Sequence, residues 1–349
     1  MRLGVNERRA LRDAAAGTAV LATAVWGGSG RLAHLDPALA GYLGATLVAA
    51  FGTTYRASAF WRRPASAFYA RALAGALRTP RRLWTVARAA GRDLATQRFV
   101  ARRSRARWAA HLVLSLGTLG SVAITVPLVF GWVRFVAVGE KTYRAVVVGV
   151  PAGRFAVEGP VGWLVFHALA LAAVAVVAGA AYFLALRVRT RALPGTAASF
   201  HVAPLVLLLA VALSGLALPA TRGSATLFPL AARLHEALVV VLLVALPFSK
   251  LGHVLVRPLQ LGAGLVRAPG ARQAACAGCG ALLAPLAQQA AVERVLAARG
   301  FRFNGHQRRC PSCRRRLVAT AQSALLGAHF HAPATGVRPA ARPSREQAA

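Results

Sequence analysis

Two histidines at opposite ends of one long apolar stretch are the first residues whose type and spacing suggest chemistry. They are His235 and His253, which lie 18 residues apart in the segment LHEALVVVLLVALPFSKLGH. In an uninterrupted helix this spacing is five whole turns, so both imidazoles would lie on one face, about 27 Å apart along the axis. At that distance they cannot share a site, and we expect each to serve a site near one surface of a membrane.

Two histidines are also matched in depth at the cytoplasmic side. His111 follows Arg107 by four residues, at the start of an apolar run. His253 precedes Arg257 by four residues, at the end of another. Two neutral imidazoles that face each other between antiparallel helices are the axial ligands of a six-coordinate b-type haem. The spacing therefore predicts a haem b site between His111 and His253.

A second haem would need two ligands near the outer surface. His235 lies at that depth in the last apolar run, and His167 follows the interfacial Trp163 by four residues in another run. We predict a second haem b between His235 and His167; if His167 faces lipid, there is one haem. The alternative for each of these histidines is an interface residue that is hydrogen-bonded to the backbone or to lipid headgroups.

The four cysteines form two short pairs near the end of the chain. CAGC carries Cys276 and Cys279, and CPSC carries Cys310 and Cys313, with 30 residues between the pairs. Two such knuckles are typical of a tetrahedral site with four thiolate ligands. We predict zinc. The alternatives are a rubredoxin-like iron site, although the intervening run lacks the acidic and aromatic residues of a rubredoxin, and four free thiols.

Composition indicates which elements must hold these residues. Of the 349 residues, 57% are hydrophobic, which is too apolar for a soluble globular domain. The predicted fold class is all-α: a polytopic transmembrane helix bundle with a small zinc-ribbon-like tail. Five firm spans have the length needed to cross a bilayer, and a weaker sixth precedes them. The firm spans are 38–60, 108–134, 161–186, 199–219 and 231–256, and the weaker one is 14–30.

The charged residues predict how the chain is oriented. The net charge is +34, and arginines gather in 62–107, in 187–191 and after 257, at alternate ends of successive spans. The positive-inside rule makes these segments and the C-terminus cytoplasmic and predicts a multi-pass protein of the cytoplasmic (inner) membrane. The arginines then attract anionic membrane lipid, and no nucleic acid is expected. The predicted parts are an N-terminal segment (1–36), the bundle (37–260), a metal-binding tail (268–320) and a disordered tail (321–349).

The run PFSKLGH, Pro247 to His253, carries a resemblance to a known family. It resembles part of the closing helix of the gamma subunit of respiratory nitrate reductase, and equally of the related membrane cytochromes b that partner heterodisulfide-reductase-like iron–sulfur proteins. The run RWAAHLVLSLGTLGSVAIT resembles the family's second ligand-bearing helix, and implies that His111 is a ligand. The resemblance covers about residues 100–260. It departs from the family at Ser121, where the family has a second histidine.

The resemblance implies a function in electron transfer. Quinol oxidised near the outer surface would pass electrons through haem to a cytoplasmic iron–sulfur or reductase subunit, so the chain would not be an enzyme by itself. Arg134, Lys141 and Glu158 are the candidate hydrogen-bond partners of the quinone.

Two other classes of function stay open. One is a haem-free membrane anchor that recruits a partner through the zinc ribbon, and the other is a transporter, which the scarcity of intramembrane acids disfavours.

Overall fold

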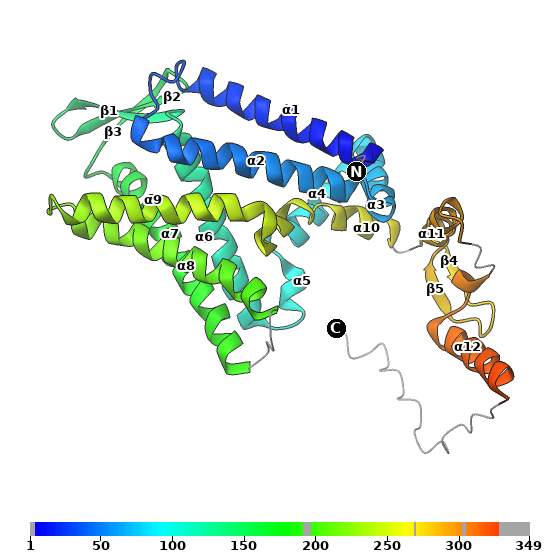
Figure 1. Ribbon diagram of the computed structural model, residues 1–349. Coiled ribbons are helices and arrows are strands. Elements are labelled where there is room, and N and C mark those ends of the chain that lie inside the picture. The colour runs from blue at the N-terminus through cyan, green and yellow to red at the C-terminus, as the bar shows by residue number, and fades with distance from the viewer. Residues whose placement is uncertain (1–3, 191–196, 269, 302–304, 328–349) are drawn as a thin grey trace. The chain divides into compact units, whose positions relative to one another are not determined.

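The computed structural model describes residues 4–190, 197–268, 270–301 and 305–327 (Figure 1). The described chain is mostly helical and divides into two compact units, one up to Leu265 and one from Val266 onward. The helices of the first unit are α1 (Val5–Gly28), α2 (Ala40–Trp61), α3 (Pro64–Leu77), α4 (Pro80–Ala90), α5 (Arg98–Ala101), α6 (Arg105–Val129), α7 (Pro160–Thr190), α8 (Ala197–Thr221) and α9 (Leu227–Ala245), and α10 (Leu259–Val266) follows at the boundary. Short 3₁₀ or π segments lie between them: η1 (Pro37–Leu39), η2 (Gly91–Ala95), η3 (Leu246–Phe248) and η4 (Lys250–Leu255).

Six long helices of the first unit pack side by side in the order α1, α2, α9, α8, α7, α6, each in contact with the next (Figure 1). The spatial order differs from the chain order, because α9 lies between α2 and α8. Asp13 on α1 accepts hydrogen bonds from Ser58 and Arg62 on α2, which joins the first two helices at one end. The segment η4, which follows α9, contacts both α2 and α8. This topology brings the end of α9 into the middle of the bundle.

Four of the described helices are long and apolar enough to cross a membrane, and they correspond to four of the five firm spans: Arg105–Val129, Pro160–Arg189, Val202–Thr221 and Leu227–Phe248. The other two predicted spans, 14–30 and 38–60, are helical, as α1 and α2, but do not belong to this apolar set. Polar side chains such as Thr53, Thr54 and Arg56 lower the hydropathy of α2. The total of five or six spans therefore stays a prediction.

Two glycines allow α6 and α7 to approach closely. A Cβ atom on Gly117 of α6 would lie 2.7 Å from the carbonyl oxygen of Ala172 on α7. A Cβ atom on Gly179 of α7 would lie 2.6 Å from the Cβ of Leu114 and 2.9 Å from the carbonyl oxygen of Ala110. Small residues at such crossings let helix backbones pack in a membrane without a hydrophobic driving force. The second contact fixes the turn of α6 that carries His111.

We expect Gly179→Ala to destabilise the bundle by about 1–3 kcal/mol, because the added methyl group overpacks a backbone contact that cannot yield. Gly120→Ala is the matched control, since its Cβ would lie at an ordinary 3.8 Å from the Cβ of Ala172. The control gains helix propensity and should be neutral or stabilising. Thermal unfolding of both variants in detergent measures the difference; equal melting temperatures would contradict the close approach.

The segment between the predicted spans 108–134 and 161–186 contains a three-stranded antiparallel sheet, so the described fold is not all-α. Its strands, in the order β1–β2–β3, are β1 (Val133–Gly139), β2 (Thr142–Val147) and β3 (Val150–Ala156). Phe135, Tyr143 and Phe155 from the three strands form an aromatic cluster with Phe166 of α7. Valine and aromatic residues favour strands. This preference explains why the connection between α6 and α7 forms strands.

The uninterrupted helix predicted over 231–256 is wrong. The α-helix ends at Ala245, and Ser249 between η3 and η4 has extended backbone angles (φ −94°, ψ 174°). Pro247 lacks an N–H donor, which favours a break, and Arg56 of α2 donates a hydrogen bond to its carbonyl oxygen. His253 therefore lies in η4 and not on the helix of His235, so the argument from five whole turns no longer holds.

The second unit is small and mixed. Its elements are β4 (Gln273–Ala275), β5 (Leu282–Pro285), α11 (Leu286–Ala298), the short η5 (His306–Arg308) and α12 (Pro311–Leu326), and β4 pairs with β5 in an antiparallel hairpin. The predicted disordered tail, 321–349, begins too early, because α12 continues to Leu326. The rest of that prediction, 328–349, lies outside the described residues.

Candidate functional site

His111 lies in the second turn of α6 and faces α7 and the segment before α5. Its Nδ1 is hydrogen-bonded to Gln97 Oε1 and lies 3.3 Å from Ser115 Oγ. Its ring meets Phe183 of α7 edge-on, with 6.1 Å between the ring centroids. An amide oxygen can only accept, so Nδ1 carries the proton and Nε2 has its lone pair free. Sequence analysis missed Gln97, which lies in a segment noticed only for its arginines.

His253 is exposed and its orientation is set locally. Its Nδ1 lies 2.6 Å from the carbonyl oxygen of Lys250 within η4. This nitrogen must therefore donate, which again leaves Nε2 free as a ligand atom. Ser249 caps the start of η4, because its hydroxyl accepts from the backbone N–H of Leu251 at 3.2 Å.

The structure brings the segments that carry His111 and His253 together. The charges of His253 and Arg257 both act on His111. Leu114, one turn after His111, and Leu251, two residues before His253, pack against the same buried cluster of α7 and α8. The segments that carry the two histidines therefore pack against the same cluster, and a broken helix carries His253 there.

His235 is the ninth of the 22 residues of the apolar segment Leu227–Phe248, closer to its first residue than to its last. Its Nδ1 lies 2.9 Å from Ser214 Oγ on α8. A Cβ atom on Gly215 would lie only 3.1 Å from the His235 Cε1. The imidazole therefore packs directly against the backbone of α8.

His167 has different surroundings. It is exposed on α7, its Nδ1 lies 2.8 Å from the carbonyl oxygen of Trp163, and its ring stacks on Trp163 with 4.8 Å between centroids. No contact between His167 and His235 is present among the described residues. The structure therefore does not bring together the two residues predicted to hold a second haem.

The three candidate partners of a quinone do not form one site. Lys141 and Glu158 form an exposed ion pair at 2.7 Å. Arg134, by contrast, lies 3.0 Å through Nη1 from the Nδ1 of His34, and its Nε is buried with no hydrogen-bond partner among the described residues. Trp132 Nε1 is buried and unpaired in the same way. Nothing in the spacing of His34 or Trp132 points to this cluster.

The four cysteines of the second unit converge on one point. Their Sγ atoms all lie within 4.8 Å of one another, so they could hold a metal ion. Cys276 follows β4 and Cys279 precedes β5, while Cys310 caps the start of α12 and Cys313 lies in its first turn. The donor set fits a metal that prefers four sulfur ligands in a tetrahedral arrangement.

Backbone N–H groups point at these sulfurs. Donation by Cys310 N, at 3.1 Å, and by Gly278 N, at 3.4 Å, lowers the pKa of Cys276 to about 6. The N–H of Cys313 lowers the pKa of Cys310, whereas the thiol hydrogen bond to Cys310 raises the pKa of Cys313 to about 12. Thiolate is the form that binds metal. A cation would therefore meet a thiolate at Cys276 at neutral pH and displace the remaining protons.

Gly278 is a position where one methyl group should disturb the cluster. A Cβ atom there would lie 3.0 Å from the Sγ of Cys313. We expect Gly278→Ala to weaken zinc binding by about tenfold, as for other changes next to metal ligands. Ser312→Ala, at an exposed position of the other knuckle, is the control. Competition of the full chain with a zinc chelator measures both affinities; equal values would contradict the crowding.

Comparison with known proteins gives no family assignment. No protein-family model matches the chain, and searches of curated proteins and of solved structures also find no match. The resemblance to the nitrate reductase gamma subunit therefore rests on the two quoted runs of sequence.

Proposed function

We propose that the chain is a membrane cytochrome b subunit that passes electrons between the quinone pool and a cytoplasmic redox partner. The observation that carries the proposal is the approach of His111 and His253, which are 142 residues apart in the sequence. Each imidazole has Nδ1 held by a carbonyl-type oxygen and Nε2 available. This is the pattern of histidines that bind iron, since an outer hydrogen bond fixes the tautomer of the ligand.

The residues around the pair suit haem b. Gln97 and the carbonyl group of Lys250 orient the two imidazoles, and Phe183 adds an apolar wall beside His111. Arg257 adds a positive charge that would attract carboxylate groups of the cofactor. Haem, when bound, supplies one-electron chemistry at a potential tuned by its axial ligands. The chain's part is to hold the two ligands at one depth.

The predicted second haem lacks comparable support, because His167 is exposed and His235 packs on α8. We now expect a haem-to-protein ratio near one in purified protein, unchanged in His167→Ala. Pyridine haemochrome absorbance against protein mass gives the ratio. A ratio near two that falls to one in His167→Ala would restore the second haem between His235 and His167.

Arg134 is the strongest of the three candidates for contact with a quinol headgroup. Its buried, unpaired Nε and the unpaired Nε1 of Trp132 are donors suited to a quinone oxygen, whereas Lys141 and Glu158 neutralise each other in solvent. His34 completes this cluster, because its Nδ1 accepts a hydrogen bond from the Arg134 guanidinium. In the proposed orientation this cluster lies at the outer side and the His111–His253 pair at the inner side.

For the cysteine cluster we propose zinc in a structural role, with iron as the alternative. Four thiolates with N–H···S hydrogen bonds serve either metal. Zinc is favoured because the cluster closes a unit with few buried apolar residues of its own: of its described residues, only Ala274 and Cys276 are buried hydrophobics. A closed zinc site supplies the folding energy that such a unit lacks.

A haem-free membrane anchor is the second candidate, favoured by the self-contained cysteine module. A reduced-minus-oxidised visible spectrum of purified protein separates the two functions. The cytochrome proposal requires the sharp α-band of low-spin haem b. The protein would be assigned as a haem-free anchor if it shows no such band after expression with ample haem, although it is folded and carries its metal in the cysteine module.

A further inference from the structure

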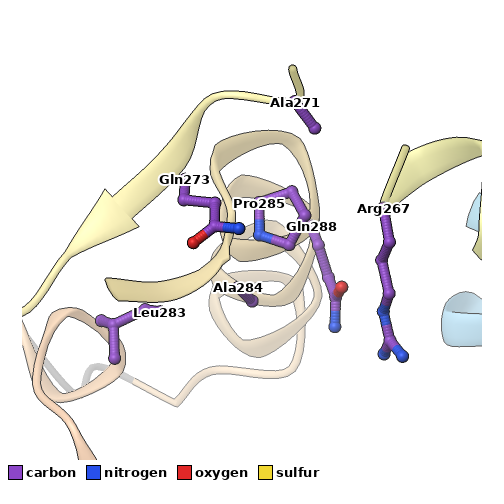
Figure 2. A pocket seen from close by; sticks show the side chains of 7 residues that line it. All are labelled: Arg267, Ala271, Gln273, Leu283, Ala284, Pro285 and Gln288. Carbon is purple, nitrogen blue, oxygen red and sulfur yellow. The ribbon is translucent and has the colours of Figure 1, made fainter. Parts of the chain in front are cut away.

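The second unit carries an arginine-lined cavity that the electron-transfer proposal does not use. Two neighbouring cavities flank β5 and α11. The larger, of about 280 Å³, is lined by Arg267, Gln273 and Gln288 among others (Figure 2). The smaller, of about 190 Å³, shares Leu283, Ala284 and Gln288 with it and adds two arginines, Arg309 and Arg314. No acidic residue lines either cavity.

Two polar atoms of the smaller cavity lack partners. Arg314 Nε and Gln288 Oε1 are both buried without a hydrogen bond among the described residues. Arg314 reaches His306 only weakly, with 3.5 Å between its Nη1 and the His306 Nε2. A ligand that satisfies the cavity must therefore offer an anionic acceptor to the guanidinium groups and a donor to the glutamine oxygen. A phosphate group that bears a neighbouring hydroxyl has both.

The helix that supplies Arg314 continues the same face with apolar side chains. Val318, Ala321 and Leu325 follow Arg314 at spacings of four, seven and eleven residues, which places all four on one side of α12. Val318 is 49% exposed and Leu325 84% exposed, so much of this apolar face is uncovered in the described unit. Arg315 and Arg316 add charge beside it, and α12 contains no acidic residue. Helices that lie in the headgroup layer of a membrane have this pattern.

A short segment joins this unit to the apolar bundle. Six residues, 267–272, join the end of α10 to β4, which spans at most about 25 Å when extended. Residues 266–349 contain thirteen arginines and two glutamates. Such a charge balance complements an anionic lipid surface, where each arginine is worth about 1 kcal/mol.

We propose that the second unit docks on the membrane by binding an anionic phospholipid headgroup. Arg309 and Arg314 take the phosphate, Gln288 accepts from a headgroup hydroxyl, and the Val318–Leu325 face of α12 enters the headgroup layer. Phosphatidylglycerol, whose headgroup carries both a phosphate and hydroxyls, matches this chemistry. The inference is independent of haem, and its test does not depend on the spectrum described above.

The test uses the full chain in nanodiscs of phosphatidylcholine alone or with 30% phosphatidylglycerol. Hydrogen–deuterium exchange of α12 is the measurement, and zinc content is checked in every sample. We expect exchange to slow by about tenfold in the anionic nanodiscs. Arg309→Gln with Arg314→Gln should abolish the slowing, and so should Leu325→Asp, which changes an exposed side chain and spares the fold. Arg294→Gln with Arg299→Gln removes the same charge outside the cavity, and this variant should retain most of the slowing of exchange.

Three outcomes would overturn the proposal. Equal exchange in both lipids would show that α12 does not meet the membrane. If free glycerol phosphate slows the exchange of α12 in phosphatidylcholine nanodiscs as much as the anionic lipid does, the cavity binds a soluble phosphate compound. An equal loss in the control pair would show that diffuse charge, and not the cavity, attracts the unit.

Discussion

Replacing His253 with alanine is expected to remove the low-spin b-type haem spectrum from the purified protein. In the proposed site the pair His111–His253 would provide the two nitrogen ligands, and the loss of one would leave iron with a single imidazole. We expect the sharp α-band of the reduced protein to fall by at least tenfold, through loss of haem or conversion to a high-spin form. His111→Ala should give the same result, because the two residues serve one site.

Added imidazole distinguishes a lost ligand from a lost fold. His253 is exposed, so the free base can enter the space left in His253→Ala and restore the α-band. His111 lies between α6 and α7, half-buried beside Phe183, so rescue of His111→Ala should be weaker. His34→Ala is the control, because the His34 Nδ1 faces Arg134 and must accept. An unchanged spectrum in both His253→Ala and His111→Ala would refute the assignment of these ligands.

The helical part of the fold was predictable because its signal is local. Three apolar runs appear as helices close to their predicted bounds and a fourth begins close to its predicted start, since length and hydropathy alone separate a membrane-length helix from other elements. The same measure fails at Pro247. The apolar run continues past Pro247, and hydropathy registers neither the missing N–H donor of this residue nor the hydrogen bond that Arg56 of α2 donates to its carbonyl oxygen. A contact between segments 191 residues apart leaves no mark on local hydropathy.

The candidate sites were predictable to different degrees for the same reason. The cysteine cluster follows from spacing, because each knuckle brings its own two sulfurs together and only one further contact is needed. The depth of His111 and His253 follows from the nearby arginines. The direction of a side chain around a helix does not: His167 has the depth expected of a ligand but stacks on Trp163 in an exposed position. Which face of α7 meets a neighbour depends on the helix order, with α9 between α2 and α8.

Replacing Cys310 with serine is expected to reduce the metal content of the chain from about one per molecule to less than a tenth and to unfold the second unit. Cys310 contributes twice: its Sγ lies 3.6 Å from that of Cys279, and it accepts the backbone N–H of Cys313 at the start of α12. Structural zinc sites supply about 10–16 kcal/mol in zinc-finger peptides. A unit with so small an apolar core should not stay folded without it.

Elemental analysis of the full chain and hydrogen–deuterium exchange of α11 and α12 test this together. In Cys310→Ser both helices should exchange at the rate of unfolded chain, while α6 and α7 in the other unit keep their protection. A strong chelator should produce the same pattern in the wild type, and zinc should reverse it. Ser312→Ala, between the two cysteines of the same knuckle, should bind metal normally. If the purified protein contains iron and shows a visible thiolate charge-transfer band, the metal is iron and not zinc. Full protection of α11 and α12 in metal-free protein would contradict a structural role for any metal there.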